Sequence, residues 1–145
     1  IGFFQTVPGF FAPGFFTANA GGQGLAAAVA LRIKPDGTQR YEPVVEFDPV
    51  QNRIVARPID LGVEGDQVFL LLFGTGIRGR NALSAVGVKI GGLDGEVTFA
   101  GAQTDFVGMD QVNVLLPAAL RGRGEVEINC TVSGKAANPV TVVIK

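Results

Sequence analysis

The chain has 145 residues, enough for one domain with a hydrophobic core, and its 47% hydrophobic content excludes a disordered chain. Its 12 Lys and Arg residues nearly balance its 13 Asp and Glu residues, so the net charge of -1 provides no field that would draw nucleic acid or anionic lipid. The sequence contains no His and a single cysteine, Cys130, which excludes imidazole chemistry, an internal disulfide and a cysteine zinc cluster.

The first 31 residues differ chemically from the rest because none of them is charged. They contain six of the 11 Phe residues, in three Gly-Phe-Phe units that begin at Gly2, Gly9 and Gly14. Pro and Gly at this spacing exclude a helix, so we expect residues 1–20 to form an extended apolar arm with too much aromatic surface to remain in water. The arm predicts an assembly interface whose candidate residues are Ile1, Phe3, Phe4, Val7, Phe10, Phe11, Phe15 and Phe16.

The start of the chain also bears on location. Because the chain begins at Ile1 rather than Met, we expect that a preceding segment was removed. No stretch approaches the ~20 apolar residues that span a bilayer, so membrane insertion is not predicted. No basic residue precedes an apolar core as in a secretory signal peptide, and an exported protein would already have lost that signal.

A hairpin is predicted next along the chain. Lys34-Pro35-Asp36-Gly37-Thr38 has the composition of a tight turn, and it would join strands at Ala26–Ile33 and Arg40–Phe47. Residues 25–31 are rich in Ala and could form a helix, but the flanking Gly and Pro favour a strand. Arg53–Leu61 contains Pro58, which suits an edge strand that lacks one hydrogen-bond donor.

The second half reads as strands separated by turns. In Gln67–Phe73 the residues on both faces of the strand are apolar, as expected of a central strand covered on both sides. Glu125–Ser133 alternates cleanly and directs Cys130 into the core. Further strands are predicted at Val86–Ile90, Glu96–Ala100, Gln111–Leu116 and Val140–Ile144, the first two separated by a turn at residues 91–95. This pattern predicts an all-β sandwich in one domain over residues 21–145, with accessory strands over 21–65 and the core sandwich over 66–145.

One motif matches a cofactor fingerprint. Gly74-Thr75-Gly76-Ile77-Arg78-Gly79 follows an apolar strand and has the G-x-G-x-x-G spacing of dinucleotide-binding loops. That mechanism requires a helix whose N-terminus points at the pyrophosphate. Residues 80–84 run directly into the predicted strand Val86–Ile90, which leaves no room for such a helix. We therefore predict a glycine loop at the end of a sandwich strand, and no cofactor.

Metal binding and catalysis have weaker signals. Asp60, Glu64 and Asp66 cluster in a Gly-containing turn and could offer oxygens to calcium, but their spacing matches no known loop, so a solvated turn is predicted and no metal site. Nothing selects a pair of acids for glycoside hydrolysis. Without His, neither Ser84 nor Ser133 has the base that a nucleophile needs. We predict no catalytic residue and no enzymatic activity.

Four blocks of sequence stand out: Ala12–Asn19, Pro58–Gly62, Leu72–Arg78 and Phe106–Pro117. Together they resemble the C-terminal domain family found at the ends of many secreted or surface proteins of acidobacteria and related bacteria. The resemblance covers about residues 8–145 and implies an immunoglobulin-like sandwich of the IPT/TIG kind, located outside the cell, with no activity. Members of that family are usually tails of longer chains, whereas we expect this domain to stand nearly alone.

Together these observations predict a non-enzymatic extracellular structural module. Its N-terminal arm would add a strand to a neighbouring subunit and give a homo-oligomer, homopolymer, filament or surface layer. The arm could instead fold back on its own sandwich. A carbohydrate- or matrix-binding adhesion module is the alternative function, although the chain has no Trp and only one Tyr, Tyr41, to stack on a sugar ring.

Overall fold

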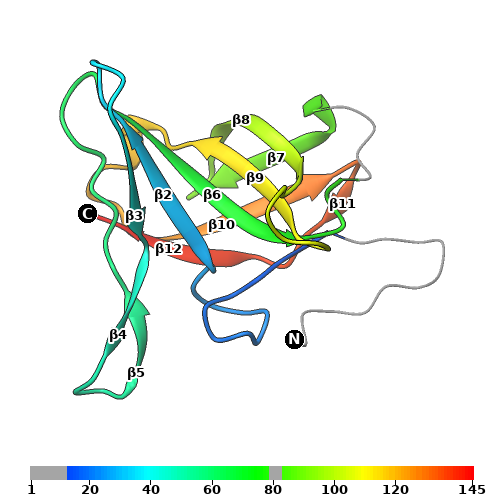
Figure 1. The fold of residues 1–145 in the computed structure, drawn as a ribbon, viewed down its shortest axis with the longest axis horizontal. Coiled ribbons are helices and arrows are strands. Elements are labelled where there is room, and N and C mark those ends of the chain that lie inside the picture. Colours follow the sequence, from blue (N-terminus) through cyan, green and yellow to red (C-terminus); the bar gives the residue numbers. More distant parts are fainter. Residues whose placement is uncertain (1–12, 79–82) are drawn as a thin grey trace.

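The computed structural model describes residues 13–78 and 83–145 (Figure 1). The predicted all-β sandwich is confirmed: apart from two single-turn 3-10 helices, η1 (Leu83–Ala85) and η2 (Ala118–Leu120), the regular elements of these residues are strands. The strands are β1 (Gly14–Phe15), β2 (Ala28–Ile33), β3 (Gln39–Pro43), β4 (Val45–Asp48), β5 (Arg53–Ala56), β6 (Gln67–Thr75), β7 (Val86–Ile90), β8 (Leu93–Ala102), β9 (Asp110–Leu115), β10 (Gly124–Val132), β11 (Lys135–Ala136) and β12 (Val140–Ile144).

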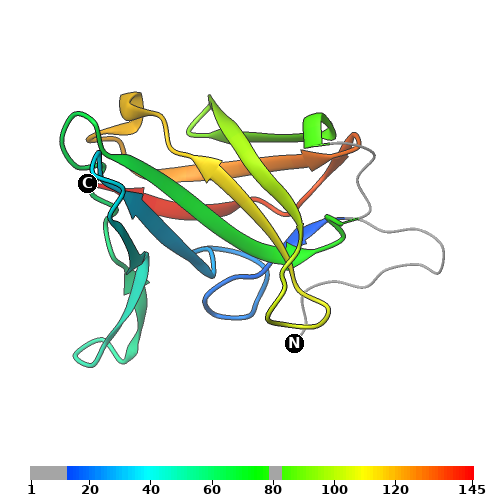
Figure 2. The same ribbon diagram turned by 45° about the horizontal axis from the view of Figure 1, so that its top comes forward.

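The strands form two layers because β8 belongs to both of them. Its first residues, Leu93–Gly95, pair with β7, and residues 96–102 pair with β9 after a shift in register between Val97 and Phe99. One layer therefore runs β3-β2-β6-β9-β8, and the other runs β8-β7-β10 and ends in β12 and β11 (Figures 1 and 2). A Cβ at Gly95 would overlap the Val114 side chain, so glycine permits the close approach at this crossover.

The core lies between these layers and follows the predicted alternation. On β10, Val126, Ile128, Cys130 and Val132 are buried while the residues between them are exposed. The central strand is β6, which pairs with β2 and β9 along its length and with β1 at its end. Its apolar residues on both faces are buried or half-buried, as the sequence predicted.

The predicted hairpin is confirmed, but its second strand is shorter than expected: Arg40–Phe47 is divided at Val44 into β3 and β4, and β4 pairs with β5 instead of β2. β2 and β3 pair from Ile33 opposite Gln39 to Val29 opposite Pro43, and the turn is closed by a 2.9 Å hydrogen bond from the Lys34 N–H to the Thr38 carbonyl. Gly37 supplies the positive φ of 87° that the turn requires.

Two further sequence predictions are wrong in detail. The turn expected over residues 91–95 consists of Gly91 and Gly92 alone, because Ile90 already pairs with Leu93 and both glycines take the positive φ of a two-residue hairpin turn. The single edge strand expected over Arg53–Leu61 is divided. Its first part is β5, which pairs with β4 in a separate two-stranded sheet, and after Pro58 the chain bridges to the other layer through Ile59 opposite Ile144.

Candidate functional site

The described end of the predicted arm lies within the chain's own sandwich. Phe15 is 1% exposed, and its backbone makes two hydrogen bonds with the Asn138 side chain, one to Oδ1 at 2.7 Å and one from Nδ2 at 3.0 Å. The Phe16 N–H donates to the Phe73 carbonyl at 2.8 Å, and a Cβ at Gly74 would overlap the Gly14 carbonyl oxygen. Strand β1 therefore lies so close to β6 that only glycine can occupy position 74.

This placement corrects one predicted interface residue. Phe15 is a core residue and offers no surface to a partner, while Phe16 is half-buried. The sequence analysis did not identify Asn138. Its Nδ2 also donates to the Gly22 carbonyl at 2.8 Å, and this hydrogen bond holds the loop after β1 in place. The other predicted interface residues lie outside the described residues: Ile1, Phe3, Phe4, Val7, Phe10 and Phe11.

A two-stranded ribbon, formed by β4 and β5, extends away from the sandwich (Figures 1 and 2). Its cross-strand pairs place Val45, Phe47, Ile54 and Ala56 on one face. Val45 packs against the core, but Phe47 is 56% exposed and Ile54 39% exposed. This apolar face thus continues the core outward into solvent. We call it the ribbon face.

Both outer edges of the ribbon have free backbone groups. The Arg57 N–H donates to the Val44 carbonyl at 2.9 Å, which fixes the alternation of hydrogen-bonded and non-hydrogen-bonded pairs along the ribbon. By that alternation the N–H and carbonyl groups of the four ribbon-face residues point away from the partner strand. Within the described part of the chain, no hydrogen bond engages them. A two-stranded ribbon is marginally stable alone, and a third strand would complete it.

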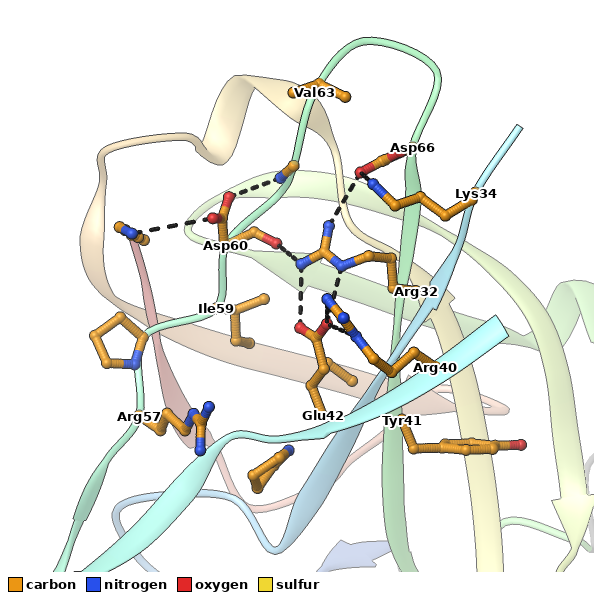
Figure 3. Close-up of a pocket in the computed structure, with 15 residues that line it drawn as sticks. Arg32, Lys34, Arg40, Tyr41, Glu42, Arg57, Ile59, Asp60, Val63 and Asp66 are labelled. Atoms are coloured by element: carbon orange, nitrogen blue, oxygen red, sulfur yellow. Dashed lines mark hydrogen bonds and ion pairs between the residues drawn. The ribbon is translucent and has the colours of Figure 1, made fainter. Parts of the chain in front are cut away.

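The second open edge belongs to β3 and borders a charged groove (Figure 3). The groove has a volume of about 890 Å³ and lies between β3 and the segment of residues 57–63. At its centre Arg32, 5% exposed, donates to both Glu42 oxygens at 3.0 and 3.1 Å and to Asp66 at 3.4 Å. Arg32 also donates to the Asp60 carbonyl. These contacts satisfy a charge that would otherwise be buried unpaired.

The electrostatics of the groove follow from these contacts. The hydrogen bond from Arg32, with a second from Arg40, holds the pKa of Glu42 below its ordinary value. The ammonium of Lys34, 3.0 Å from Asp66, lowers the pKa of that carboxyl in the same way. Glu42 and Asp66 are therefore both ionised at neutral pH and balance the buried charge of Arg32. The Oδ1 atom of Asp66 has no hydrogen-bond partner.

This cluster corrects the prediction of a solvated turn. The Asp66 side chain is 1% exposed and belongs to the ion-pair cluster, whereas Glu64 is exposed as predicted. A sequence signal was available, because Arg32 continues the inward positions of Ala28 and Ala30 on β2, where a charged residue needs partners. The described residues contain no group of three or more acidic or cysteine side chains placed to hold a metal ion.

The glycine loop after β6 holds a carboxylate of the protein itself. The N–H groups of Ile77 and Arg78 donate to Asp110 Oδ2 at 2.8 and 3.0 Å, and Arg78 Nε lies 2.6 Å from Oδ1. Asp110 is 2% exposed. Two of the amides that a phosphate would need are thus already engaged. Gly79 lies outside the described residues, and the next described element is the single turn η1, followed directly by β7.

Two other residues considered in the sequence analysis are Tyr41, as a platform for a sugar ring, and Cys130, as a core residue. Tyr41 is exposed, but Figure 3 shows its ring directed away from Arg57 and Asp60, so it forms no platform over the groove. Burial raises the pKa of the Cys130 thiol to about 12, which leaves it unreactive at neutral pH.

Comparison of the chain with protein-family models, curated proteins and solved structures gives no match. The resemblance inferred from the four sequence blocks therefore stays a prediction. No helix among the described residues is long and apolar enough to cross a membrane.

Proposed function

We propose that the protein is a non-enzymatic assembly module in which the N-terminal segment of one copy adds as a strand to the β4–β5 ribbon of the next. The observation that carries the proposal is the ribbon face, an exposed apolar surface bordered by unpaired backbone edges. An open strand edge of this kind is a template for pairing with another chain.

The N-terminal segment has the chemistry to complete that surface. Residues 1–12 contain no charged side chain and four Phe residues. In an added strand, Ile1, Phe3 and Val7 would share one face and meet Phe47 and Ile54. The opposite face of the ribbon has charged residues such as Glu46 and Arg53, so it offers no comparable surface.

Placement of the two surfaces favours contact between copies. Figures 1 and 2 show β1, which follows the N-terminal segment, and the β4–β5 ribbon toward opposite ends of the molecule. A donor at one end and an acceptor at the other make a head-to-tail contact, which propagates into a filament unless the rotation closes a ring. On the resemblance described above, we place this assembly outside the cell.

The contribution of the ribbon face can be bounded. Full burial of a Phe or Ile side chain is worth about 1.5–3 kcal/mol. Scaled by their exposed fractions of 56% and 39%, Phe47 and Ile54 together would contribute about 1.5–3 kcal/mol on being covered. That corresponds to about a tenfold to hundredfold change in the association constant.

Sedimentation velocity and negative-stain microscopy of the full chain test the proposal. We expect the wild-type chain to form assemblies, and we expect both deletion of residues 1–11 and the double variant Phe47→Ser/Ile54→Ser to give monomers with an unchanged far-ultraviolet spectrum. Phe106→Ser is the matched control, because Phe106 is 61% exposed on the loop between β8 and β9.

Three results would oppose the proposal. One is a wild-type chain that stays monomeric at every concentration. Another is a ribbon variant that assembles as well as wild type. The third is a Phe106→Ser control that weakens assembly as much as the ribbon variant, which would point to general loss of apolar surface.

A further inference from the structure

We propose that the groove beside β3 binds an extended acidic peptide, which adds as a strand to the free edge of β3 and places its carboxylates against Arg57 and Arg40. This inference goes beyond the assembly function, because it concerns a different edge with different chemistry.

The free edge of β3 offers backbone groups for a partner strand. The hydrogen bond from Lys34 to Thr38 fixes the alternation along the β2–β3 pair. Gln39, Tyr41 and Pro43 then direct their backbone groups away from β2. Pro43 has no N–H, but its carbonyl and both groups of Gln39 and Tyr41 can pair with an added strand, and none has a partner within the described residues.

The groove contains more positive than negative side chains. Its cations are Arg32, Lys34, Arg40, Arg57 and Lys145, and its acids are Glu42, Asp60 and Asp66. This excess of two positive charges occurs in a chain with a net charge of -1. The groove is therefore an electropositive site on a protein whose remaining side chains are net negative.

Several of these cations have N–H donors that the contacts within the groove do not use. Arg57 is exposed, and its guanidinium makes no hydrogen bond or ion pair within the described residues. Figure 3 shows it directed toward β3 and Glu42. Arg40 bonds to Glu42 with part of its fork only, and Lys145 lies 4.0 Å from Asp60. An incoming carboxylate can accept from Arg57 without breaking the cluster around Arg32.

The same charges make the uncharged N-terminal segment a poor occupant of this edge. A strand beside β3 points every second side chain into the groove. Phe at those positions would take Arg40 and Arg57 out of water and offer no acceptor in return, which is unfavourable. Glu or Asp at those positions would instead form charge-assisted hydrogen bonds.

The shape of the groove favours a chain over a small anion. Four consecutive residues, Arg40–Pro43, line one wall, and the volume of about 890 Å³ lies near the upper end of ordinary ligand sites. A peptide uses both the backbone edge and the cations, whereas a free carboxylate uses only the cations. Acidic residues at every second position satisfy both requirements.

Fluorescence polarisation with the full chain tests this inference. The probe is a fluorescein-labelled Glu-Val-Glu-Val-Glu peptide, and the comparison peptide has Lys in place of Glu. We expect the acidic peptide alone to bind, more weakly at high salt, and we expect Arg57→Gln to lower its affinity about tenfold or more through loss of a charged hydrogen bond. Arg53→Gln, an exposed arginine on β5 outside the groove, should bind as wild type.

Backbone pairing is tested separately with two N-methylated probes, one methylated at its Glu residues and one at its Val residues. Because alternate residues of a strand donate to the same side, we expect one of the two to lose binding and the other to retain it. Equal binding of both probes would reduce the groove to a simple anion site and overturn the strand model. Failure of the acidic peptide to bind, or an equal effect of Arg53→Gln and Arg57→Gln, would overturn the inference as well. Neither result depends on whether the ribbon mediates assembly.

Discussion

Replacement of Phe15 by Ala measures how firmly the end of the N-terminal region is fixed to its own domain. The ring is 1% exposed in the core, and the backbone on both sides of it is hydrogen bonded to Asn138. Truncation of a buried Phe to Ala costs about 3–5 kcal/mol, a large share of the roughly 5–15 kcal/mol that stabilises an ordinary domain. With a urea m-value of about 2 kcal/mol/M, the unfolding midpoint should fall by roughly 2 M.

The assay is urea unfolding followed by circular dichroism, because the chain has no Trp. Phe106→Ala is the matched control: its ring is 61% exposed, and its replacement should change stability by no more than about 0.5 kcal/mol. A loss of less than about 1 kcal/mol for Phe15→Ala, or one equal to the control, would refute the argument that β1 is an integral strand of the sandwich.

Three other residues give predictions of the same kind. Gly74→Ala should destabilise the fold and release β1, because the new Cβ would overlap the Gly14 carbonyl; calorimetry showing an unchanged Tm would contradict this. Because the pKa of Glu42 is lowered in the folded protein, its ionised form stabilises the fold above the ordinary carboxyl pKa, and this stability is lost as pH falls through the lowered value. The difference in unfolding free energy between wild type and Glu42→Gln should therefore be large at pH 7 and disappear on acidification. A difference independent of pH would show that the ion pair is not responsible. With a pKa of about 12, Cys130 has on the order of one thiolate in ten thousand at pH 8, so native protein should resist a thiol reagent that labels it rapidly in urea; rapid native labelling would contradict its burial.

The strands could be predicted from the sequence because their signals are local. The turn at Lys34–Thr38 has the Pro and Gly that its dihedral angles require, and the alternation around Cys130 has the period of a half-buried strand. The same local rules overestimated the turn after Ile90. Two consecutive glycines already close a hairpin, and the extra residues read as turn, Leu93–Gly95, begin the next strand.

The alternation on β2 marks Arg32 as an inward charge, but its partners were not predictable in the same way, because they are far apart in the chain. Arg32 meets Glu42 within a hairpin, but Asp66 lies 34 residues after Arg32 and reaches it only after β6 has paired with β2. The ribbon face could not be predicted from the sequence either. Arg53–Leu61 reads as one strand, and nothing local reveals that Pro58 divides a projecting ribbon from a segment of the other layer.

The contact between the N-terminal segment and the ribbon can be tested most directly by disulfide trapping between two singly substituted chains. Phe3→Cys is made in one chain and Ile54→Cys in another, and the two are mixed under mild oxidation; the native Cys130 is buried and does not compete. Strand addition at the ribbon predicts a covalent heterodimer whose disulfide, located by mass spectrometry, joins positions 3 and 54, with little product when Phe106→Cys replaces Ile54→Cys. Absence of that heterodimer, or an equal yield with Phe106→Cys, would contradict strand addition at the ribbon.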